Sequence, residues 1–185
     1  MIGNDIIDLK IAKAENKSEN NRFLNKVFTE QEQGVIRSSS NPEAQLWVFW
    51  SMKETAYKAL QRILKFSRKI EPLSFACYLD EEPERGYVQI GGNSFPVRLQ
   101  MNSEYIYCQT GSINSFHKIF KDKESRSMFV NEVATKFECS PLDIRIEKDE
   151  NRIPSLYFEN SPRILPISIS HHGRFTAFLI PLINS

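Results

Sequence analysis

The chain has 185 residues, of which 41% are apolar and 25% are charged, and its formal net charge at pH 7 is +1. This composition can bury a sizeable core and gives no general attraction to nucleic acid or membranes. No apolar run is long enough to span a bilayer, and the first residues lack the features of a signal peptide. Because the three cysteines, Cys77, Cys108 and Cys139, are isolated among apolar residues, we expect buried thiols in a cytoplasmic protein.

The first part of the chain is expected to be one strand followed by short helical segments. The pattern predicts a strand, then a polar loop or frayed helix start, then a helical turn, over residues 5–11, 12–21 and 21–26. Thr29 begins a helix, because Thr29 and Glu32 have the spacing of a capping box. Residues 38–42 break it, and Asn41 caps the next helix with Pro42 at its first position.

This second helix is long, reaching about Leu64, and its charged residues are its most informative feature. From Leu46 onward it is apolar on nearly every face, which is typical of a buried helix. It nevertheless carries Lys53, Glu54 and Lys58, and charged groups are seldom buried without a partner or a bound ion. Glu54 and Lys58 project from one face, so we expect a site for a metal ion and an anion; a simple helix ion pair is the alternative.

The rest of the chain is expected to be mostly β-structure. Alternating stretches predict an antiparallel meander over residues 73–79, 87–90, 95–101 and 104–108. A helix is predicted over residues 122–137, with Phe129, Val133 and Phe137 on one stripe. Strands are predicted over residues 144–147, 155–158, 166–170 and 174–180. The repeated order of helix and then strands indicates an α+β fold.

Two further groups of polar residues are candidate sites. Asp5 and Asp8 flank two isoleucines at a strand end, where carboxylates could bind Mg²⁺; ordinary polar residues at a strand end are the alternative. Ser170 and His171 lie between two strand-like stretches and could hold a phosphate, with structural packing as the alternative. The neighbouring His171 and His172 do not indicate zinc, because adjacent side chains on a strand point to opposite faces.

Four motifs together resemble the 4′-phosphopantetheinyl transferase superfamily and span nearly the whole chain. They are Gly-x-Asp, Phe-Ser/Thr-x-x-Glu, Trp-x-x-Lys-Glu-Ala/Ser-x-x-Lys-Ala and Ser-x-Ser-His, matched by residues 3–5, 28–32, 50–59 and 168–171. The third motif is the specific one. The resemblance implies an α+β transferase that moves the phosphopantetheine arm of coenzyme A onto a serine of an apo acyl or peptidyl carrier protein. It also implies dependence on Mg²⁺ and release of 3′,5′-ADP.

The resemblance assigns the metal site to carboxylates. Asp5 and Glu54 match the family's metal ligands, and Asp8 and Glu32 are possible further ligands. The position two residues after Asp5, where the large branch of the family often has a second acid, holds Ile7.

The resemblance also assigns residues to catalysis and to coenzyme A. Glu54 and Lys58 are the catalytic residues, and Lys58, Ser170 and His171 bind coenzyme A. The chain departs from the large branch after Lys58, where no Gly-Lys-Gly run follows. It departs again at residues 152–154, where Arg-Ile-Pro replaces the usual Gly-Lys-Pro.

The order of the motifs predicts two related lobes, each with a long helix packed on an antiparallel sheet. Residues 1–112 carry the metal-binding carboxylates, residues 113–185 carry the Ser-x-Ser-His motif, and the active site lies between them. We expect such a chain to act as a monomer; the alternative is an oligomer of the small-branch type, which has the same motif order. For function, the alternatives are a catalytically degenerate homologue that only binds coenzyme A or a carrier, and another Mg²⁺-dependent phosphoryl-transfer enzyme.

Overall fold

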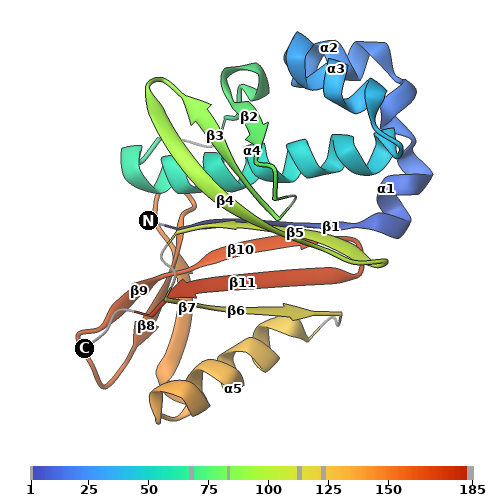
Figure 1. Ribbon diagram of the computed structural model, residues 1–185. Coiled ribbons are helices and arrows are strands. Elements are labelled where there is room, and N and C mark those ends of the chain that lie inside the picture. Colours follow the sequence, from blue (N-terminus) through green and yellow to red (C-terminus); the bar gives the residue numbers. More distant parts are fainter. Residues whose placement is uncertain (1, 67–68, 83, 112–113, 122–123, 183–185) are drawn as a thin grey trace.

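The computed structural model describes residues 2–66, 69–82, 84–111, 114–121 and 124–182. It combines helices with antiparallel sheets, which confirms the α+β class (Figure 1). Short 3₁₀ turns lie at Lys17–Glu19, Pro72–Ser74 and Pro141–Asp143. The helices and strands are β1 (Gly3–Asp8), α1 (Leu9–Glu15), α2 (Asn21–Val27), α3 (Glu30–Ser38), α4 (Pro42–Leu64), β2 (Ala76–Leu79), β3 (Arg85–Ile90), β4 (Asn93–Met101), β5 (Tyr105–Thr110), β6 (Ser115–Phe120), α5 (Ser125–Phe137), β7 (Ile144–Lys148), β8 (Pro154–Phe158), β9 (Ile164–Pro166), β10 (Ser168–His172) and β11 (Phe175–Pro181).

Within the described residues the strands form three antiparallel sheets, with orders β1-β5-β4-β3-β2, β10-β11-β6 and β7-β8-β9. The long helix α4 packs on the first sheet and contacts mainly β1 and β5. Strand β1 is the edge of the first sheet and lies beside β10, which is an edge of the second (Figure 1). The first and last parts of the chain therefore meet along β1 and β10.

The two predicted helix starts are confirmed in their detailed geometry. Thr29 and Glu32 form the capping box of α3, each side chain accepting the other's backbone N–H. The Asn41 side chain accepts a hydrogen bond from Ala44 N at the start of α4, and Pro42 occupies its first position. These caps satisfy amide donors that the first turn of a helix leaves unpaired.

Two large groups of buried side chains form the core, with α4 in one and α5 in the other. In the second group the ring of Phe129 stacks on Phe178 with centroids 4.4 Å apart. Phe129 and Val133 are fully buried and Phe137 packs against them, as the predicted stripe requires. Full burial of one such apolar side chain contributes about 1.5–3 kcal/mol to stability. Each of these two groups thus combines a helix, α4 or α5, with the strands on which it packs.

Several predicted boundaries are wrong, for local reasons. The first strand ends at Asp8 and not at residue 11, because Asp8 Oδ1 accepts the backbone N–H of Lys10 and caps α1. The predicted loop over residues 12–21 includes the end of α1 and a 3₁₀ turn. Strand β6 was not predicted, and the strand expected over residues 166–170 is split between β9 and β10. The predicted lobe boundary at residues 112–113 and helix start at residue 122 lie outside the described residues.

The thiol prediction and the absence of a membrane helix can be checked in the described residues. Cys77 and Cys108 are buried, Cys139 is partly buried, and all three are free. In the part of the chain that the structure describes, no helix is long and apolar enough to cross a membrane.

Gly3 allows the unusually close approach of β1 to α4. A Cβ atom built on Gly3 would lie 2.2 Å from the backbone oxygen of Thr55 and 3.0 Å from the backbone nitrogen of Ala59. Both neighbours belong to the helix backbone and cannot rotate away. Any larger residue would therefore push β1, and with it Asp5, away from α4.

Candidate active site

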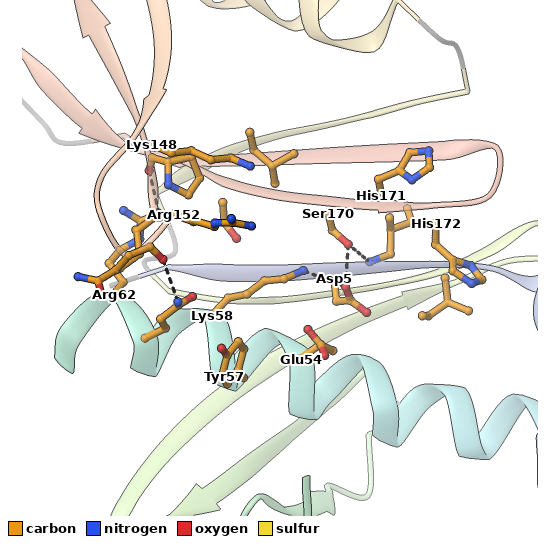
Figure 2. A pocket seen from close by; sticks show the side chains of 18 of the residues that line it. Asp5, Glu54, Tyr57, Lys58, Arg62, Lys148, Arg152, Ser170, His171 and His172 are labelled. Carbon is orange, nitrogen blue, oxygen red and sulfur yellow. Dashed lines mark hydrogen bonds and ion pairs between the residues drawn. The ribbon is translucent and has the colours of Figure 1, made fainter. Parts of the chain in front are cut away.

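A pocket of about 480 Å³ opens where β1, α4 and β10 meet the segment that follows β7 (Figure 2). Among the described residues, two carboxylates and four lysine or arginine side chains line it: Asp5, Glu54, Lys58, Arg62, Lys148 and Arg152. In Figure 2, Asp5, Glu54 and Ser170 lie toward one end, and Arg62, Lys148 and Arg152 toward the other. The excess of positive charge suits a ligand with several negative charges.

Asp5 lies in the middle of β1 and is 6% exposed. Its Oδ1 accepts hydrogen bonds from Lys58 Nζ at 3.0 Å and from Ser170 Oγ at 2.7 Å. Its Oδ2 accepts no hydrogen bond from the described residues. One oxygen of this nearly buried carboxylate is therefore left for a ligand from the pocket.

Glu54 and Lys58 reach the pocket from one face of α4, as their four-residue spacing predicts. Lys58 Nζ also donates to the backbone oxygen of Asn4 at 2.8 Å, so it is anchored to β1 at two points. Its side chain is 22% exposed and lines the pocket. Carboxylate and ammonium groups thus stand together on a largely buried helix.

The Ser-x-Ser-His motif forms most of β10, and its side chains alternate between two faces. Ser168, Ser170 and His172 face β1, where each accepts a backbone N–H of that strand. His171 is exposed on the rim of the pocket. The hydroxyl of Ser170 is occupied, because it accepts from Ile6 N at 3.0 Å and donates to Asp5.

The basic end of the pocket is built by the segment that follows β7 and by the last turn of α4. Asp149 Oδ1 accepts the backbone N–H groups of Asn151 and Ile153 and so closes a tight turn. Arg152, within this turn, has a φ of 62°, which is rare for a residue with a side chain. Arg62 Nη2 donates to the backbone oxygens of Pro154 and Ile167 and ties the segment to α4; burial lowers the pKa of its guanidinium.

Glu32, a possible metal ligand by resemblance, does not line the pocket. It is 2% exposed and forms a 2.9 Å ion pair with Lys53, which is fully buried. Its two oxygens also accept the backbone N–H groups of Thr29 and Cys77. Lys53 in turn donates to the backbone oxygens of Pro72 and Phe75. The second and third motifs thus meet in a buried ion pair, and we leave Glu32 out of the candidate site.

Asp8, the other possible ligand, is occupied by Arg174. The guanidinium of Arg174 binds both carboxylate oxygens, at 2.8 and 2.7 Å, and its backbone N–H binds Oδ2 at 3.0 Å. The hydrogen bonds from the Arg174 side chain hold the pKa of Asp8 well below its usual value of 3.8. This fully buried carboxylate joins the beginning of the chain to its end and does not line the pocket.

The structure also adds pocket residues that sequence reasoning missed. Lys148 carries no motif signal, and Arg152 stands out only as a departure from Gly-Lys-Pro. The stretch that contains Arg62 is not expected to contact the nucleotide, because it lacks the Gly-Lys-Gly run, yet Arg62 lines the pocket. His172 could have been found from strand alternation, since it lies two residues after Ser170 and on the same face. Its Nδ1 accepts Asp8 N at 2.8 Å, and its ring packs against Trp47 with centroids 5.8 Å apart.

Comparisons with known proteins agree with the motif reading. The profile of the 4′-phosphopantetheinyl transferase superfamily matches residues 1–110. A holo-[acyl-carrier-protein] synthase of Chlamydia caviae is 31% identical over 116 residues, covering 56% of this chain and 88% of that protein. The enzyme of the same name from Chlamydia muridarum is 42% identical over 59 residues, covering 32% of this chain and 47% of the relative. A crystal structure of Helicobacter pylori holo-[acyl-carrier-protein] synthase with coenzyme A is 18% identical, covering 99% of this chain and all of that one, with a TM-score of 0.28.

Proposed function

Because the chain belongs to the 4′-phosphopantetheinyl transferase superfamily, we propose that it is a holo-[acyl-carrier-protein] synthase. The proposed reaction transfers the phosphopantetheine arm of coenzyme A to a serine of an apo acyl carrier protein and releases 3′,5′-ADP. The observation that carries this proposal is the pocket itself. It combines Asp5, Glu54 and Lys58 at one end with an excess of cations at the other, which suits a ligand with a pyrophosphate and a further phosphate.

The donors at the carboxylate end fit a magnesium ion. Mg²⁺ is usually held in proteins by one or two carboxylates, and its remaining positions are filled by waters and substrate phosphates. Asp5 offers Oδ2, and Glu54 lines the same pocket. We propose these two carboxylates as the protein ligands of the metal ion. When bound there, Mg²⁺ would neutralise phosphate charge and align the reactants.

The remaining chemistry is assigned to side chains of α4. The serine oxygen of the carrier forms a bond to the β-phosphorus of coenzyme A, and the bond from that phosphorus to 3′,5′-ADP breaks. We assign to Glu54 the role of the general base that accepts the serine proton, because it lines the same pocket. Lys58, anchored to Asp5 and to the Asn4 carbonyl, stabilises the charge that develops on the leaving phosphate.

The cations at the other end are proposed to bind the phosphates of coenzyme A. Lys148 and Arg152 form no ion pair with the described residues, so their charges are available to a ligand. His171 stands at the exposed rim, where it can contact a phosphate that extends out of the pocket. We propose that Arg152 takes the place of the lysine that other family members carry in Gly-Lys-Pro.

The proposal is tested by incubating the chain with an apo acyl carrier protein, coenzyme A and Mg²⁺, and measuring the intact mass of the carrier. We expect the carrier to gain the mass of one phosphopantetheine group, and 3′,5′-ADP to appear in equal amount. An unchanged carrier would contradict the proposal. Calorimetry with coenzyme A would then show whether the chain is a binding module without turnover.

A further inference from the structure

Strands β1 and β10 are joined by side chains instead of by a backbone ladder. Three alternate backbone N–H groups of β1 each donate to a side chain of β10. The pairs are Asn4 with Ser168 Oγ at 3.1 Å, Ile6 with Ser170 Oγ at 3.0 Å and Asp8 with His172 Nδ1 at 2.8 Å. Successive donors are two residues apart on β1, and successive acceptors are two residues apart on β10. These bonds therefore fix the alignment of the two strands.

Of the three β10 side chains that accept these bonds, Ser170 is the one that also contacts the candidate metal site. Its hydroxyl donates to Asp5 Oδ1 at 2.7 Å while it accepts from Ile6 N. Ser168 accepts Asn4 N in the same way, but it bonds to no carboxylate among the described residues. The two serines are similarly buried, at 4% exposure for Ser168 and 5% for Ser170. They therefore differ mainly in the bond to Asp5.

We propose that Ser170 is a positioning residue for the metal site and not a ligand of coenzyme A. This inference rests on the proposed function. Together with Lys58, Ser170 fixes Asp5 Oδ1 and so leaves Oδ2 to the cation. Rotation of a carboxylate about its last torsion is otherwise only weakly restrained. The bond links the register of the two strands to the geometry of a metal ligand that comes from the other end of the chain.

The comparison of Ser170→Ala with Ser168→Ala separates this role from a purely structural one. Each change leaves one backbone N–H of β1 without its acceptor, so the melting temperature should fall by a similar amount in both variants. Ser170→Ala alone also frees the Asp5 carboxylate. Removing such an outer contact of a metal ligand commonly lowers metal affinity by about 10- to 100-fold.

The first measurement is Mn²⁺ binding followed by electron paramagnetic resonance, with coenzyme A present and its own Mn²⁺ binding subtracted. We expect Ser170→Ala to weaken Mn²⁺ binding by about 10- to 100-fold and to raise the Mg²⁺ concentration needed for half-maximal transfer. Ser168→Ala should keep both values near those of the unmodified chain, while its melting temperature falls as far as that of Ser170→Ala.

Equal Mn²⁺ binding in the two variants, whether weakened in both or in neither, overturns the proposal. If Ser170→Ala does not fold, the same comparison is made between Ser170→Cys and Ser168→Cys, because a thiol keeps the approximate volume but is a weak donor. The unmodified chain is assayed alongside. If it fails to modify a carrier, the proposed function fails, whereas the Mn²⁺ comparison still decides the role of Ser170.

Discussion

The negative charge of Glu54 is the single-residue feature on which the proposed chemistry depends most. Glu54→Gln removes that charge at nearly constant shape, so the protein should fold with an unchanged or higher melting temperature. Loss of a general base commonly lowers a rate by roughly 100- to 10,000-fold, and we expect a fall in transfer rate at least that large. Glu132→Gln on α5, away from the pocket, is the matched control and should leave the rate unchanged. Near-normal turnover by Glu54→Gln would remove Glu54 from the mechanism.

Arg152 tests the basic end of the pocket. Arg152→Ala removes one charge-assisted phosphate contact, worth about 1.5–3 kcal/mol, so the KM for coenzyme A should rise about 10- to 100-fold. Arg145→Ala is the control, because Arg145 lies nearby on β7 but pairs with Glu147 and Glu159 outside the pocket. The same comparison with 3′-dephospho-coenzyme A locates the contact. If the variant's defect persists with that substrate, Arg152 binds the pyrophosphate and not the 3′-phosphate.

Arg174 tests the link between the two ends of the chain through pH. Because the pKa of Asp8 in the folded protein is depressed by Arg174, the stabilisation is fully present above the usual pKa of 3.8 and is lost as the pH falls below it. Arg174→Ala should lower the free energy of unfolding at neutral pH, because the buried Asp8 carboxylate loses its cationic partner. That difference should shrink between about pH 4 and pH 2, as measured by urea unfolding. A difference that stays constant with pH would assign the loss to packing.

At the level of elements, the contact between β1 and α4 determines the geometry of the pocket. Gly3→Ala would place a Cβ atom 2.2 Å from the Thr55 carbonyl, so β1 must shift and move Asp5 away from Lys58. We expect a lower melting temperature and a loss of transfer activity. Gly34→Ala in α3 is the control, because nothing lies within 4 Å of its added Cβ atom, and it should stabilise by about 0.5–1 kcal/mol. Normal activity of Gly3→Ala would show that this contact does not position the site.

Local signals were sufficient for the elements that begin with a side-chain cap. The starts of two helices are predicted by Thr29 and by Asn41 with Pro42. The four-residue spacing of Glu54 and Lys58 predicts that they share one helix face. The end of β1 was missed because Asp8 interrupts an apolar alternation that continues to Ile11. Asp8 acts as a cap only because helix α1 follows it, and the apolar pattern of the strand does not predict that helix.

The contacts of the site residues could not be read from the sequence, because they join positions more than fifty residues apart. The bonds of Asp5 with Lys58 and Ser170, and of Asp8 with Arg174, depend on how the sheets pack. The resemblance implies that Glu32 is a possible metal ligand, whereas in the structure Glu32 forms a buried ion pair with Lys53. A motif carboxylate can bind a metal or pair with a buried cation, and the burial of Glu32 beside Lys53 shows the second arrangement here.

For the whole molecule, we propose that residues on either side of the boundary near residue 112 form two lobes with the site between them. Two observations support this division: separate cores form around α4 and α5, and the pocket takes side chains from β1 and α4 as well as from β10 and the segment after β7. A smaller buried group takes Ile6 and Tyr107 from one side of the boundary and Phe175 and Ala177 from the other. On this view a single chain holds a complete active site.

The central claim is therefore tested by the specific activity of transfer as the protein is diluted, measured together with its molar mass by light scattering. If one chain holds the complete site, the molar mass should be that of a monomer, 21.5 kDa, and the activity per molecule should stay constant at every concentration. An activity per molecule that falls in step with the dissociation of an oligomer would contradict the account, because the site would then be shared between chains.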